Sequence, residues 1–333
     1  MENAIWFNLV KSAPRLDLVE APCPTCRSRR NSPVARGVDF EYRTCSNEFS
    51  FVRCAGCSTV FLNPRPRVED LGLIYPTNYY SFVHAEKSGR YNPLVQKVWD
   101  LLERKRLKLF WSLLGRRPRR LLDMGCGTGR LLTLLRKCGY PEWQLVGVEF
   151  GIPYELAGER KDGIRIYKGL YEEVAFQEAP FDLIVAQQVI EHAYDPRVML
   201  KKTFDDLAPG GYAIFDTPDF NSIDRRLFRK SYWGGYHFPR HMTLFTPETF
   251  SRLAGSLGFE VVRCRKMLSP VFWLISVHNL LVGAGLPPKW AGKIHYQALP
   301  LIAASTMLEL ANLLVLRWNS NMRIILRKPA VRE

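Results

Sequence analysis

Two pairs of cysteines near the N-terminus are spaced as metal ligands often are. Cys23 and Cys26 form one CxxC pair, and Cys54 and Cys57 form a second. Each pair encloses a proline or a glycine, which favours a tight turn that points both thiolates at one ion. Four thiolates suit a tetrahedral structural zinc with no open coordination position. The spacing therefore predicts a small zinc module whose folding depends on the metal.

A glycine-rich turn in the middle of the chain predicts a cofactor site. Gly125, Gly127 and Gly129 stand at alternate positions shortly after Asp123. Glycines let the backbone turn tightly and approach a ligand where any Cβ would clash. Glu149 follows about 20 residues later at the end of a predicted strand, where a carboxylate can accept both hydroxyls of a ribose. The order of these residues predicts a ribose-containing cofactor.

Three of the six histidines fall in segments that we expect near the ends of strands, namely His192, His237 and His241. Histidine changes its charge near neutral pH, so it is the natural candidate for a general base. A lone histidine is more often part of a packed core, and each of the three has that alternative interpretation. The sequence alone does not decide which of them is indispensable.

Alternating strands and helices must position these residues. Between residues 120 and 216, runs of β-branched and aliphatic residues alternate with segments of helical periodicity, which is typical of a doubly wound parallel sheet. Ligands of such sheets bind at the carboxyl ends of the strands. An amphipathic helix over 93–114 precedes this unit. The expected strands span 120–123, 144–149, 163–167, 181–186, 210–216, 259–264 and 322–327, with helices over 130–138 and 249–258.

Several motifs occur in a recognisable order, namely the D-x-G-x-G-x-G turn, the acid that ends the second strand, the FDLI strand with its V-I-E-H turn, and L-x-P-G-G. Over residues 119–262 they resemble class I S-adenosylmethionine-dependent methyltransferases. The resemblance implies an α/β fold with a doubly wound, seven-stranded, Rossmann-like sheet and S-adenosyl-L-methionine as cofactor. It also implies that Asp123 and the glycine turn hold the methionine part of the cofactor, that Glu149 holds the ribose, and that Gln187 or Gln188 lines the pocket.

The cysteine pairs, the aromatic stretch that ends at Phe82 and the segment 235–245 extend this resemblance. They are similar to methyltransferases of deoxysugar, antibiotic and polysaccharide pathways, some of which methylate sugar carbon. The sugar C-methyltransferases have a Y-H-E-H core, and here Arg240 replaces its glutamate. The resemblance therefore implies methyl transfer to a sugar or glycan intermediate, nucleotide-linked or lipid-linked. Oxygen and carbon stay open as the acceptor atom.

Methyl transfer to a hydroxyl or an enolisable carbon requires a base that removes the acceptor's proton. We expect His241 to be this base, and His237 and Tyr236 to position the substrate. Tyr79 or Tyr80 is expected to contribute a hydroxyl from the zinc module, and Tyr80 is the one assigned to the catalytic set.

The turn formed by Glu191 and His192 has a second interpretation. Ubiquinone-type O-methyltransferases have a similar E-x-x-E-H turn, which binds a divalent metal. Here Gln188 replaces the first acid, which favours a structural role in which His192 caps or packs the turn. Both interpretations stay open.

Two apolar stretches separate the last two predicted strands. Residues 267–288 contain no charged residue, and residues 294–316 contain only Glu309. Their length approaches that of a bilayer span, but both flanking strands belong to one sheet, so the insertion must leave and return on the same side. Lysines and arginines flank it, as they do in peripheral contacts with anionic lipid. We expect an apolar helical insertion that contacts an anionic membrane surface, forms a homodimer interface or covers the substrate.

The composition supports two folded units in a reducing compartment. The chain of 333 residues is 47% hydrophobic, enough for a core of ordinary size. Its eight cysteines do not form a disulfide framework, and its N-terminus lacks a signal-peptide pattern. These features predict a cytoplasmic protein, peripheral on the inner face of the membrane if the insertion binds lipid. The predicted units are 1–92 (zinc-binding module and linker), 93–266 (methyltransferase domain), 267–320 (apolar insertion) and 321–333 (last strand of the sheet).

A formal net charge of +15 predicts attraction to an anionic partner, but it does not distinguish nucleic acid, nucleotide-linked sugar and an acidic membrane. Ribosomal RNA methylation is the alternative function, because a zinc ribbon, basic charge and this fold also occur together in enzymes that modify RNA. The segment 186–192 lacks the Asn/Asp-Pro-Pro-aromatic turn with which amino-directed enzymes hold a flipped base, which counts against nucleic acid. A membrane-attached scaffold without turnover is a third alternative, which the intact cofactor motifs disfavour.

Overall fold

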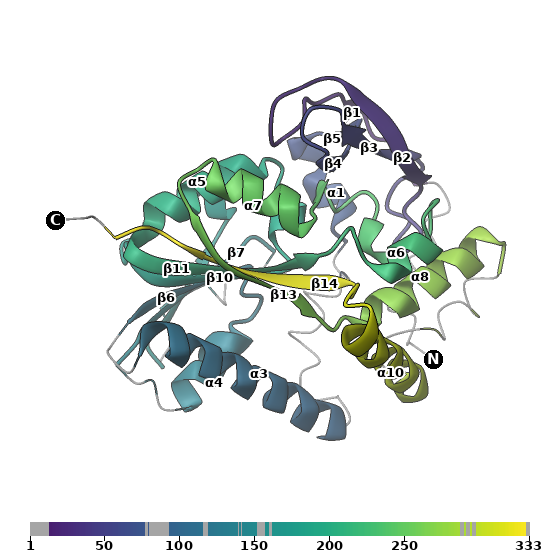
Figure 1. Ribbon diagram of the computed structural model, residues 1–333. Helices are drawn as coiled ribbons and strands as arrows, with labels where there is room; N and C mark the ends of the chain where they lie inside the picture. The colour runs from purple at the N-terminus through teal and green to yellow at the C-terminus, as the bar shows by residue number, and fades with distance from the viewer. Residues whose placement is uncertain are drawn as a thin grey trace.

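The computed structural model describes residues 13–76, 79, 93–115, 119–138, 140, 142–151, 157–159, 162–286, 290, 294 and 298–330. A mixed sheet forms its centre (Figure 1). The strands of this sheet are β6 (Arg120–Met124), β7 (Gln144–Glu149), β8 (Gly158–Glu159), β9 (Ile164–Lys168), β10 (Phe181–Gln187), β11 (Leu207–Pro218), β13 (Glu260–Met267) and β14 (Asn321–Arg327). Their spatial order is β13-β14-β11-β10-β6-β7-β9-β8.

The sheet has the predicted doubly wound topology. Strands β9, β7, β6, β10 and β11 are parallel to one another, whereas β14 and β13 run antiparallel at one edge. The predicted seven-stranded, Rossmann-like sheet is therefore confirmed. The two-residue strand β8 adds an antiparallel strand beyond β9 that the sequence did not predict.

Helices cover both faces of this sheet (Figure 1). One face carries α3 and α4, whose side chains Phe110 and Leu135 are buried with residues of the strands. The other face carries α5 and α7, which bury Leu200 and Leu253. These four helices are α3 (Pro93–Leu114), α4 (Arg130–Lys137), α5 (Pro196–Asp206) and α7 (Pro247–Gly255), and three of them match the predicted helices closely.

The N-terminal unit is a small antiparallel sheet that is completed by a strand from far along the chain. Strand β12 pairs with β4, with Thr243 opposite Phe61 and Leu244 opposite Val60. The order of this sheet is β12-β4-β3-β2. Its elements are β2 (Asn31–Gly37), β3 (Phe49–Cys54), β4 (Val60–Leu62) and β12 (Thr243–Leu244), flanked by the pair β1 (Leu18–Val19) and β5 (Arg65–Pro66) and by η1 (Val68–Asp70) and α1 (Leu71–Ile74).

The N-terminal unit also shares a hydrophobic core with the segment that follows β11. Phe51 and Leu62 of the small sheet are buried together with Trp233, Tyr236 and Phe238. Apolar side chains from both segments are removed from water together in this cluster, which holds the N-terminal unit against the domain that contains the central sheet. The packing positions the segment 235–245, which contains two of the candidate histidines.

The described part of the predicted apolar insertion contains two long helices, which lie between β13 and β14 in the chain. The helix α8 packs against α10, and α8 also contacts α6 and η5. None of the helices in the described ranges is long and apolar enough to span a membrane. These elements are α8 (Pro270–Gly283), α10 (Leu299–Val315), α6 (Ile223–Leu227) and η5 (Gly234–Tyr236). Two further short helices among the described residues are η3 (Tyr171–Glu173) and η4 (Ile190–His192).

Candidate active site

The glycine turn after β6 leaves open space along its backbone. Gly125, Gly127 and Gly129 have positive φ angles of 69°, 53° and 78°. A Cβ at Gly125 would lie 2.6 Å from Val189 Cγ2, so a side chain there would displace this valine. A Cβ at Gly127 would meet no atom of the described residues within 4 Å. The backbone at Gly127 can therefore approach a ligand closely.

Glu149, at the end of β7, faces this turn. Its carboxylate accepts hydrogen bonds from the backbone N–H groups of Gly127 (3.1 Å) and Gly151 (3.2 Å). Burial raises the pKa of Glu149, and the backbone donors partly oppose this rise. Asp123 is also buried, near the end of β6. The two carboxylates and the open turn fit the predicted cofactor, because S-adenosyl-L-methionine presents ribose hydroxyls and an ammonium group to its site.

The two predicted glutamines lie at and just after the end of β10. Gln188 has a φ angle of 53°, and its backbone N–H donates to the carbonyl of Asp216 (2.8 Å). Its side-chain amide donates to Asn321 Oδ1 (3.2 Å). Gln187 is the last residue of the strand. All the predicted cofactor residues thus gather at the carboxyl ends of the adjacent strands β7, β6 and β10, and their contact with a cofactor stays a prediction.

Three histidines lie together beside the glycine turn. The ring centroids of His192 and His241 are 4.5 Å apart, and those of His237 and His241 are 5.0 Å apart. His192 is the last residue of η4. This short helix begins directly after Val189, whose side chain lies beside Gly125. The fold therefore brings the three histidines of the sequence analysis into one cluster next to the cofactor turn.

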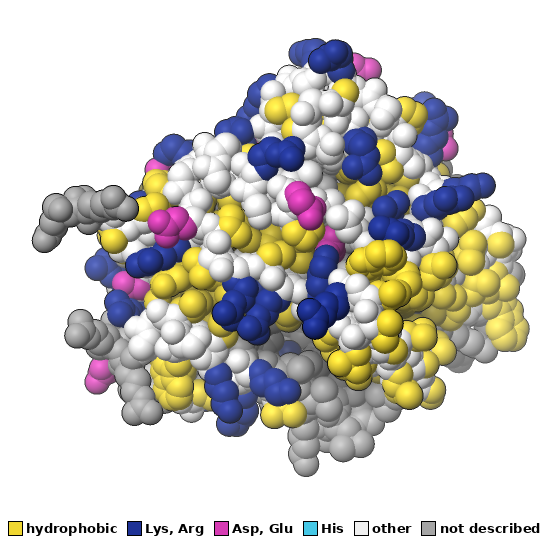
Figure 2. All heavy atoms as spheres, viewed as in Figure 1, with side chains coloured by type: hydrophobic (Ala, Val, Ile, Leu, Met, Phe, Trp, Pro, Cys, Tyr) yellow, Lys and Arg dark blue, Asp and Glu magenta, His cyan; other side chains and the backbone are white. Residues whose placement is uncertain are grey.

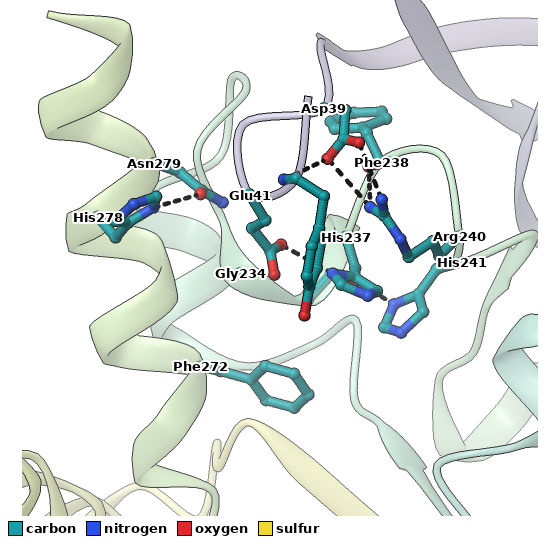
Figure 3. A network of polar contacts seen from close by, with 12 residues as sticks. Asp39, Glu41, Gly234, His237, Phe238, Arg240, His241, Phe272, His278 and Asn279 are labelled. Atoms are coloured by element: carbon teal, nitrogen blue, oxygen red, sulfur yellow. Dashed lines mark hydrogen bonds and ion pairs between the residues drawn. The ribbon is translucent and has the colours of Figure 1, made fainter. Parts of the chain in front are cut away.

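A carboxylate of the N-terminal unit contacts His237 (Figure 3). His237 Nδ1 lies 2.8 Å from Glu41 Oε1, and both side chains are buried. His237 Nε2 lies 3.2 Å from the hydroxyl of Tyr79. Since a carboxylate accepts, Nδ1–H donates to Glu41, and Nε2 then accepts from the tyrosine hydroxyl. The result is a carboxylate–imidazole–hydroxyl chain centred on a histidine whose backbone is left-handed, with φ 40°.

The other two imidazoles are held neutral. His241 Nδ1–H donates to the carbonyl of Gly235 (2.8 Å), which leaves Nε2 as an acceptor. Burial lowers the pKa of His241 well below its ordinary value, and the neighbouring His192 and His237 lower it further. Burial and the charge of His237 also lower the pKa of His192 to about 3. The hydroxyl of Tyr75 lies 3.0 Å from His192 Nδ1.

Arg240 has a buried partner in the N-terminal unit. Its guanidinium makes two hydrogen bonds to Asp39, at 3.0 Å and 2.9 Å, and it lies 4.4 Å from the ring centroid of Tyr42. Burial alone would raise the pKa of Asp39, but the charge and hydrogen bonds of Arg240 lower it to about 2. Arg240 therefore anchors the histidine segment to the N-terminal unit.

Glu191 lies beside the histidines and could take part in binding a cation. Its Oε2 accepts from the hydroxyl of Thr217 (2.9 Å), whereas its buried Oε1 has no hydrogen-bond partner among the described residues. Burial raises the pKa of Glu191 to about 8. Ligand atoms of Glu191, His192 and His241 lie within 4.8 Å of one another, so they could hold a divalent ion. The metal interpretation of this turn stays open.

Of the two tyrosines predicted for the catalytic set, the structure describes Tyr236. Tyr236 is buried, its hydroxyl donates to the carbonyl of Arg229 (2.8 Å), and its ring stacks on Phe51 at a centroid distance of 5.4 Å. Its role as a substrate positioner stays a prediction. Tyr80 lies outside the described residues, whereas Tyr79, the other candidate, contacts His237.

Three residues of the site were not predicted individually from the sequence, namely Asp39, Glu41 and Tyr75. The ring of Tyr75 lies 5.3 Å from that of Phe150, the residue after Glu149, and so connects the cofactor turn to the histidines. The two acids lie in an irregular segment between β2 and β3. Local motifs do not mark them, because their partners come from the segment after η5.

The four predicted zinc ligands come together in the N-terminal unit. Cys23 Sγ lies 3.4 Å from Cys57 Sγ, and Cys26 Sγ lies 3.4 Å from Cys54 Sγ. All four sulfurs lie within 4.8 Å of one another. A tetrahedral zinc with Zn–S bonds of about 2.3 Å places its sulfurs about 3.8 Å apart. The cluster fits that ion, and zinc binding itself stays a prediction.

Comparisons with known proteins found relatives that match part of this chain and solved structures that resemble it. A ubiquinone biosynthesis O-methyltransferase from Caulobacter is 33% identical over 101 residues, which are 29% of this chain and 40% of that relative. Another from Pseudomonas fluorescens is 26% identical over 153 residues, which are 41% of this chain and 64% of that relative. A SAM-dependent methyltransferase from Archaeoglobus fulgidus has a similar structure, with a TM-score of 0.44, 18% identity and coverage of 75% of this chain and 100% of that one.

The matches to the two O-methyltransferases cover less than two thirds of either relative. A family model described as a methyltransferase domain matches residues 95–263, slightly more than half of the chain. This range contains the glycine turn, Glu149 and the three clustered histidines. The chain therefore belongs to the methyltransferase-domain family.

Proposed function

We propose that the protein transfers a methyl group from S-adenosyl-L-methionine to a sugar or glycan intermediate, nucleotide-linked or lipid-linked, with a histidine as general base. The observation that carries this proposal is the chain of Glu41, His237 and Tyr79, which lies in a histidine cluster beside the glycine turn. Methyl transfer to a hydroxyl or an enolisable carbon needs a cofactor site next to a proton acceptor.

Gly127 and Glu149 support the cofactor part of the proposal. The backbone beside Gly127 is open, and the carboxylate of Glu149 is close enough to accept from its N–H. Glu149 would hold the ribose hydroxyls, and Asp123 with the glycine turn would hold the methionine part. When bound, S-adenosyl-L-methionine supplies an electrophilic methyl group on a sulfonium. The protein's part is to align the acceptor with that group and to remove the acceptor's proton.

His237 is the better supported base. A proton taken up at Nε2 creates an imidazolium next to the Glu41 carboxylate, which stabilises it. The hydroxyl of Tyr79, hydrogen-bonded to Nε2, can relay the proton. It takes the proton of the substrate group that is methylated and donates its own proton to the imidazole. The acceptor atom bonds to the methyl carbon as the carbon–sulfur bond breaks, and the released proton ends on His237.

His241, the base expected from the sequence, has no carboxylate partner among the described residues of the kind that Glu41 provides to His237. Its Nε2 is available as an acceptor because Nδ1 donates to the carbonyl of Gly235. Proton uptake by His241 is opposed by burial and by the two neighbouring imidazoles. We therefore assign His241 to orienting the acceptor through Nε2 and retain it as a variant in the test below.

A sugar acceptor is supported by the segment 235–245 and by the position of Glu41. The sugar C-methyltransferases, to which this segment is similar, have a glutamate where Arg240 stands. Glu41 supplies a carboxylate to His237 from another part of the chain, while Arg240 pairs with Asp39. The net charge of +15 also suits a phosphate-linked, anionic acceptor.

A phenolic acceptor is the second candidate. The relatives that match part of this chain are ubiquinone biosynthesis O-methyltransferases. Aromatic rings also lie between Glu149 and the histidines, with the centroids of Tyr75 5.3 Å from Phe150 and 5.0 Å from Tyr79. Such rings can pack on the faces of an aromatic acceptor.

The test is the transfer of radiolabelled methyl from S-adenosyl-L-methionine by the purified full chain into a lysate separated into nucleotide-sugar, lipid and RNA fractions. We expect label in a nucleotide sugar or a glycolipid, and a rate that falls about 100-fold or more in His237→Asn. Label in a phenolic lipid would favour the second candidate. Label in RNA would contradict both and favour the RNA alternative.

Binding of S-adenosylhomocysteine, measured by calorimetry, is the control for each variant. His237→Asn and His241→Asn should bind it as the wild-type protein does, because neither side chain belongs to the predicted cofactor site. A loss of binding together with transfer would indicate misfolding. If the wild-type protein bound neither cofactor nor product, the methyltransferase proposal would fail and the scaffold alternative would remain.

A further inference from the structure

The helix α10 has polar side chains inside and apolar side chains outside. Ser305, Glu309 and Asn312 share one face of the helix and are buried. Met307 and Leu314 are 71% and 81% exposed. A helix on the surface of a water-soluble protein has the opposite arrangement. The outer side of α10 is therefore suited to apolar surroundings.

Buried hydrogen bonds hold α10 in this orientation. Glu309 is the only acidic residue between positions 267 and 318. Its carboxylate accepts from the backbone N–H of Ser269 (3.1 Å), the indole of Trp273 (2.9 Å) and the amide of Asn319 (3.0 Å). Rotation of the helix to bury its leucines would break these hydrogen bonds and leave a desolvated carboxylate without donors. These hydrogen bonds therefore fix the apolar side of α10 outward in the hairpin that α8 and α10 form.

Exposed apolar side chains of neighbouring elements extend this side. Leu227 of α6, Leu280 of α8 and Trp318 after α10 are 64%, 40% and 38% exposed. Figure 2 shows hydrophobic side chains gathered over α8 and α10. Contiguous apolar patches of this kind mark interaction sites. We use the term apolar face for Leu227, Leu280, Met307, Leu314, Val315 and Trp318.

One cation contacts the apolar face, and others lie close to its residues in the sequence. The guanidinium of Arg226 lies 3.9 Å from the ring centroid of Trp318. Arg229, Lys230 and Arg317 are exposed nearby in the sequence, at the ends of α6 and α10. No acidic side chain of the hairpin reaches the surface, because its single carboxylate is buried. Tryptophan and arginine at the border of an apolar surface suit the headgroup region of a bilayer.

We propose that the apolar face docks on an anionic membrane surface. The apolar side chains would enter the boundary of the acyl chains, and the bordering cations would meet lipid phosphates. A second copy of the chain on this face would instead bring two basic borders together, which charge repulsion disfavours. In this arrangement the apolar face rests on the membrane surface, so docking is peripheral.

Docking would bring the candidate active site close to the lipid. The inner side of α8 contacts η5, where the hydroxyl of Ser276 accepts from the backbone N–H of Gly234 (2.8 Å). A Cβ at Gly234 would lie 2.7 Å from the carbonyl oxygen of Phe272, so the helix and the loop are in close contact. His237 follows this loop directly. The inference rests on the apolar face and its neighbouring cations, and it does not depend on the proposed methyl transfer.

Co-sedimentation of the purified full chain with vesicles tests this inference. One set of vesicles contains equal parts of phosphatidylcholine and phosphatidylglycerol, and the other contains phosphatidylcholine alone. We expect binding to the first set, weakened by added NaCl, and little binding to the second. The double variant Leu314→Glu/Val315→Glu should lose binding by about 10-fold or more, since both side chains are largely exposed and their replacement leaves the core unchanged.

Val198→Glu is the matched control, because Val198 is an exposed apolar residue of α5, away from the hairpin. It should bind vesicles as the wild-type protein does. A second double variant, Arg229→Glu/Lys230→Glu, should also lose binding. Unchanged binding of Leu314→Glu/Val315→Glu would overturn the proposal, as would a concentration-dependent dimer that this variant dissociates. Binding of S-adenosylhomocysteine by both double variants would show that a loss of vesicle binding is separate from the cofactor site.

Discussion

Arg240 and Asp39 are 201 positions apart in the sequence and form a fully buried, bidentate ion pair. Their two hydrogen bonds are 3.0 Å and 2.9 Å long. Asp39 also accepts from the backbone N–H groups of Tyr42 (3.0 Å) and Thr44 (2.9 Å). One carboxylate thus organises the segment of the N-terminal unit that also contains Glu41, and ties it to the segment of His237.

Removal of the Asp39 charge should destabilise the protein strongly. In Asp39→Asn, the guanidinium of Arg240 stays buried without its counter-charge, which typically costs about 3–5 kcal/mol. We expect the free energy of unfolding, measured by urea titration, to fall by about this amount. Asp17→Asn is the control, because Asp17 is 83% exposed and lies 3.9 Å from Arg67. A loss below about 1 kcal/mol in Asp39→Asn would mean that the pair contributes as little as a surface ion pair.

The same pair predicts a loss of stability in acid. The pKa of Asp39 is about 2 in the folded protein and has an ordinary value of 3.8. A carboxyl group whose pKa is lowered by folding adds stability that is complete above its unfolded pKa and is lost as the pH falls through its folded pKa. The difference in melting temperature between the wild-type protein and Asp39→Asn should therefore shrink as the pH falls from 5 to about 2. A constant difference over this range would contradict the assignment.

Glu41 should act through His237 and not through the cofactor. Glu41→Gln keeps the shape of the side chain but removes the charge that stabilises a proton on His237. We expect kcat for methyl transfer to fall about 10-fold to 100-fold, less than for loss of the base itself, with unchanged binding of S-adenosylhomocysteine. Glu48→Gln is the matched control, because Glu48 is an exposed acid of the same unit. Equal activities of the two variants would exclude a positioning role for Glu41.

Glu149 should be needed for cofactor affinity. Glu149→Ala removes the carboxylate that faces the glycine turn, and hydrogen bonds to a charged group contribute about 1.5–3 kcal/mol. The Kd for S-adenosylhomocysteine, measured by calorimetry, should therefore rise about 10-fold to 100-fold. Glu173→Ala serves as the control, because Glu173 is exposed in η3. An unchanged Kd in Glu149→Ala would place the ribose elsewhere.

The cysteine cluster should hold about one zinc ion per chain. Cys54→Ser removes one of four ligands, so we expect a lower zinc content by metal analysis and a less stable N-terminal unit. Cys264→Ser is the control, because Cys264 is exposed on β13 and lies outside the cluster. Full zinc content in Cys54→Ser, or none in the wild-type protein, would count against a structural zinc.

The cofactor turn and the sheet could be predicted from the sequence because their signals are local. The glycines at 125, 127 and 129 are required by a backbone that has positive φ at each position. The buried strands around them are continuous apolar runs, as parallel strands covered on both faces must be. The cysteine pairs are also local, since each CxxC turn contributes two ligands on its own.

The environment of the histidines could not be predicted in this way. Glu41 and Asp39 acquire their partners only when the N-terminal unit packs on the segment after η5. The pairing of β12 with β4 brings these two segments together, and strand pairing between distant segments leaves no mark in either one alone. For this reason the sequence named His237 and His241 as candidates but did not identify the carboxylate that distinguishes them.

For the apolar hairpin of α8 and α10 as well, the sequence predicted one part of the structure and tertiary contacts decided the other. From the sequence alone, the lack of charge determined that the insertion is apolar, and the basic flanks predicted contact with an anionic surface. Periodicity does not say which face points inward. That was decided by the tertiary contacts of Glu309 with Ser269, Trp273 and Asn319, because a buried carboxylate must find hydrogen-bond donors, and those donors lie outside its own helix.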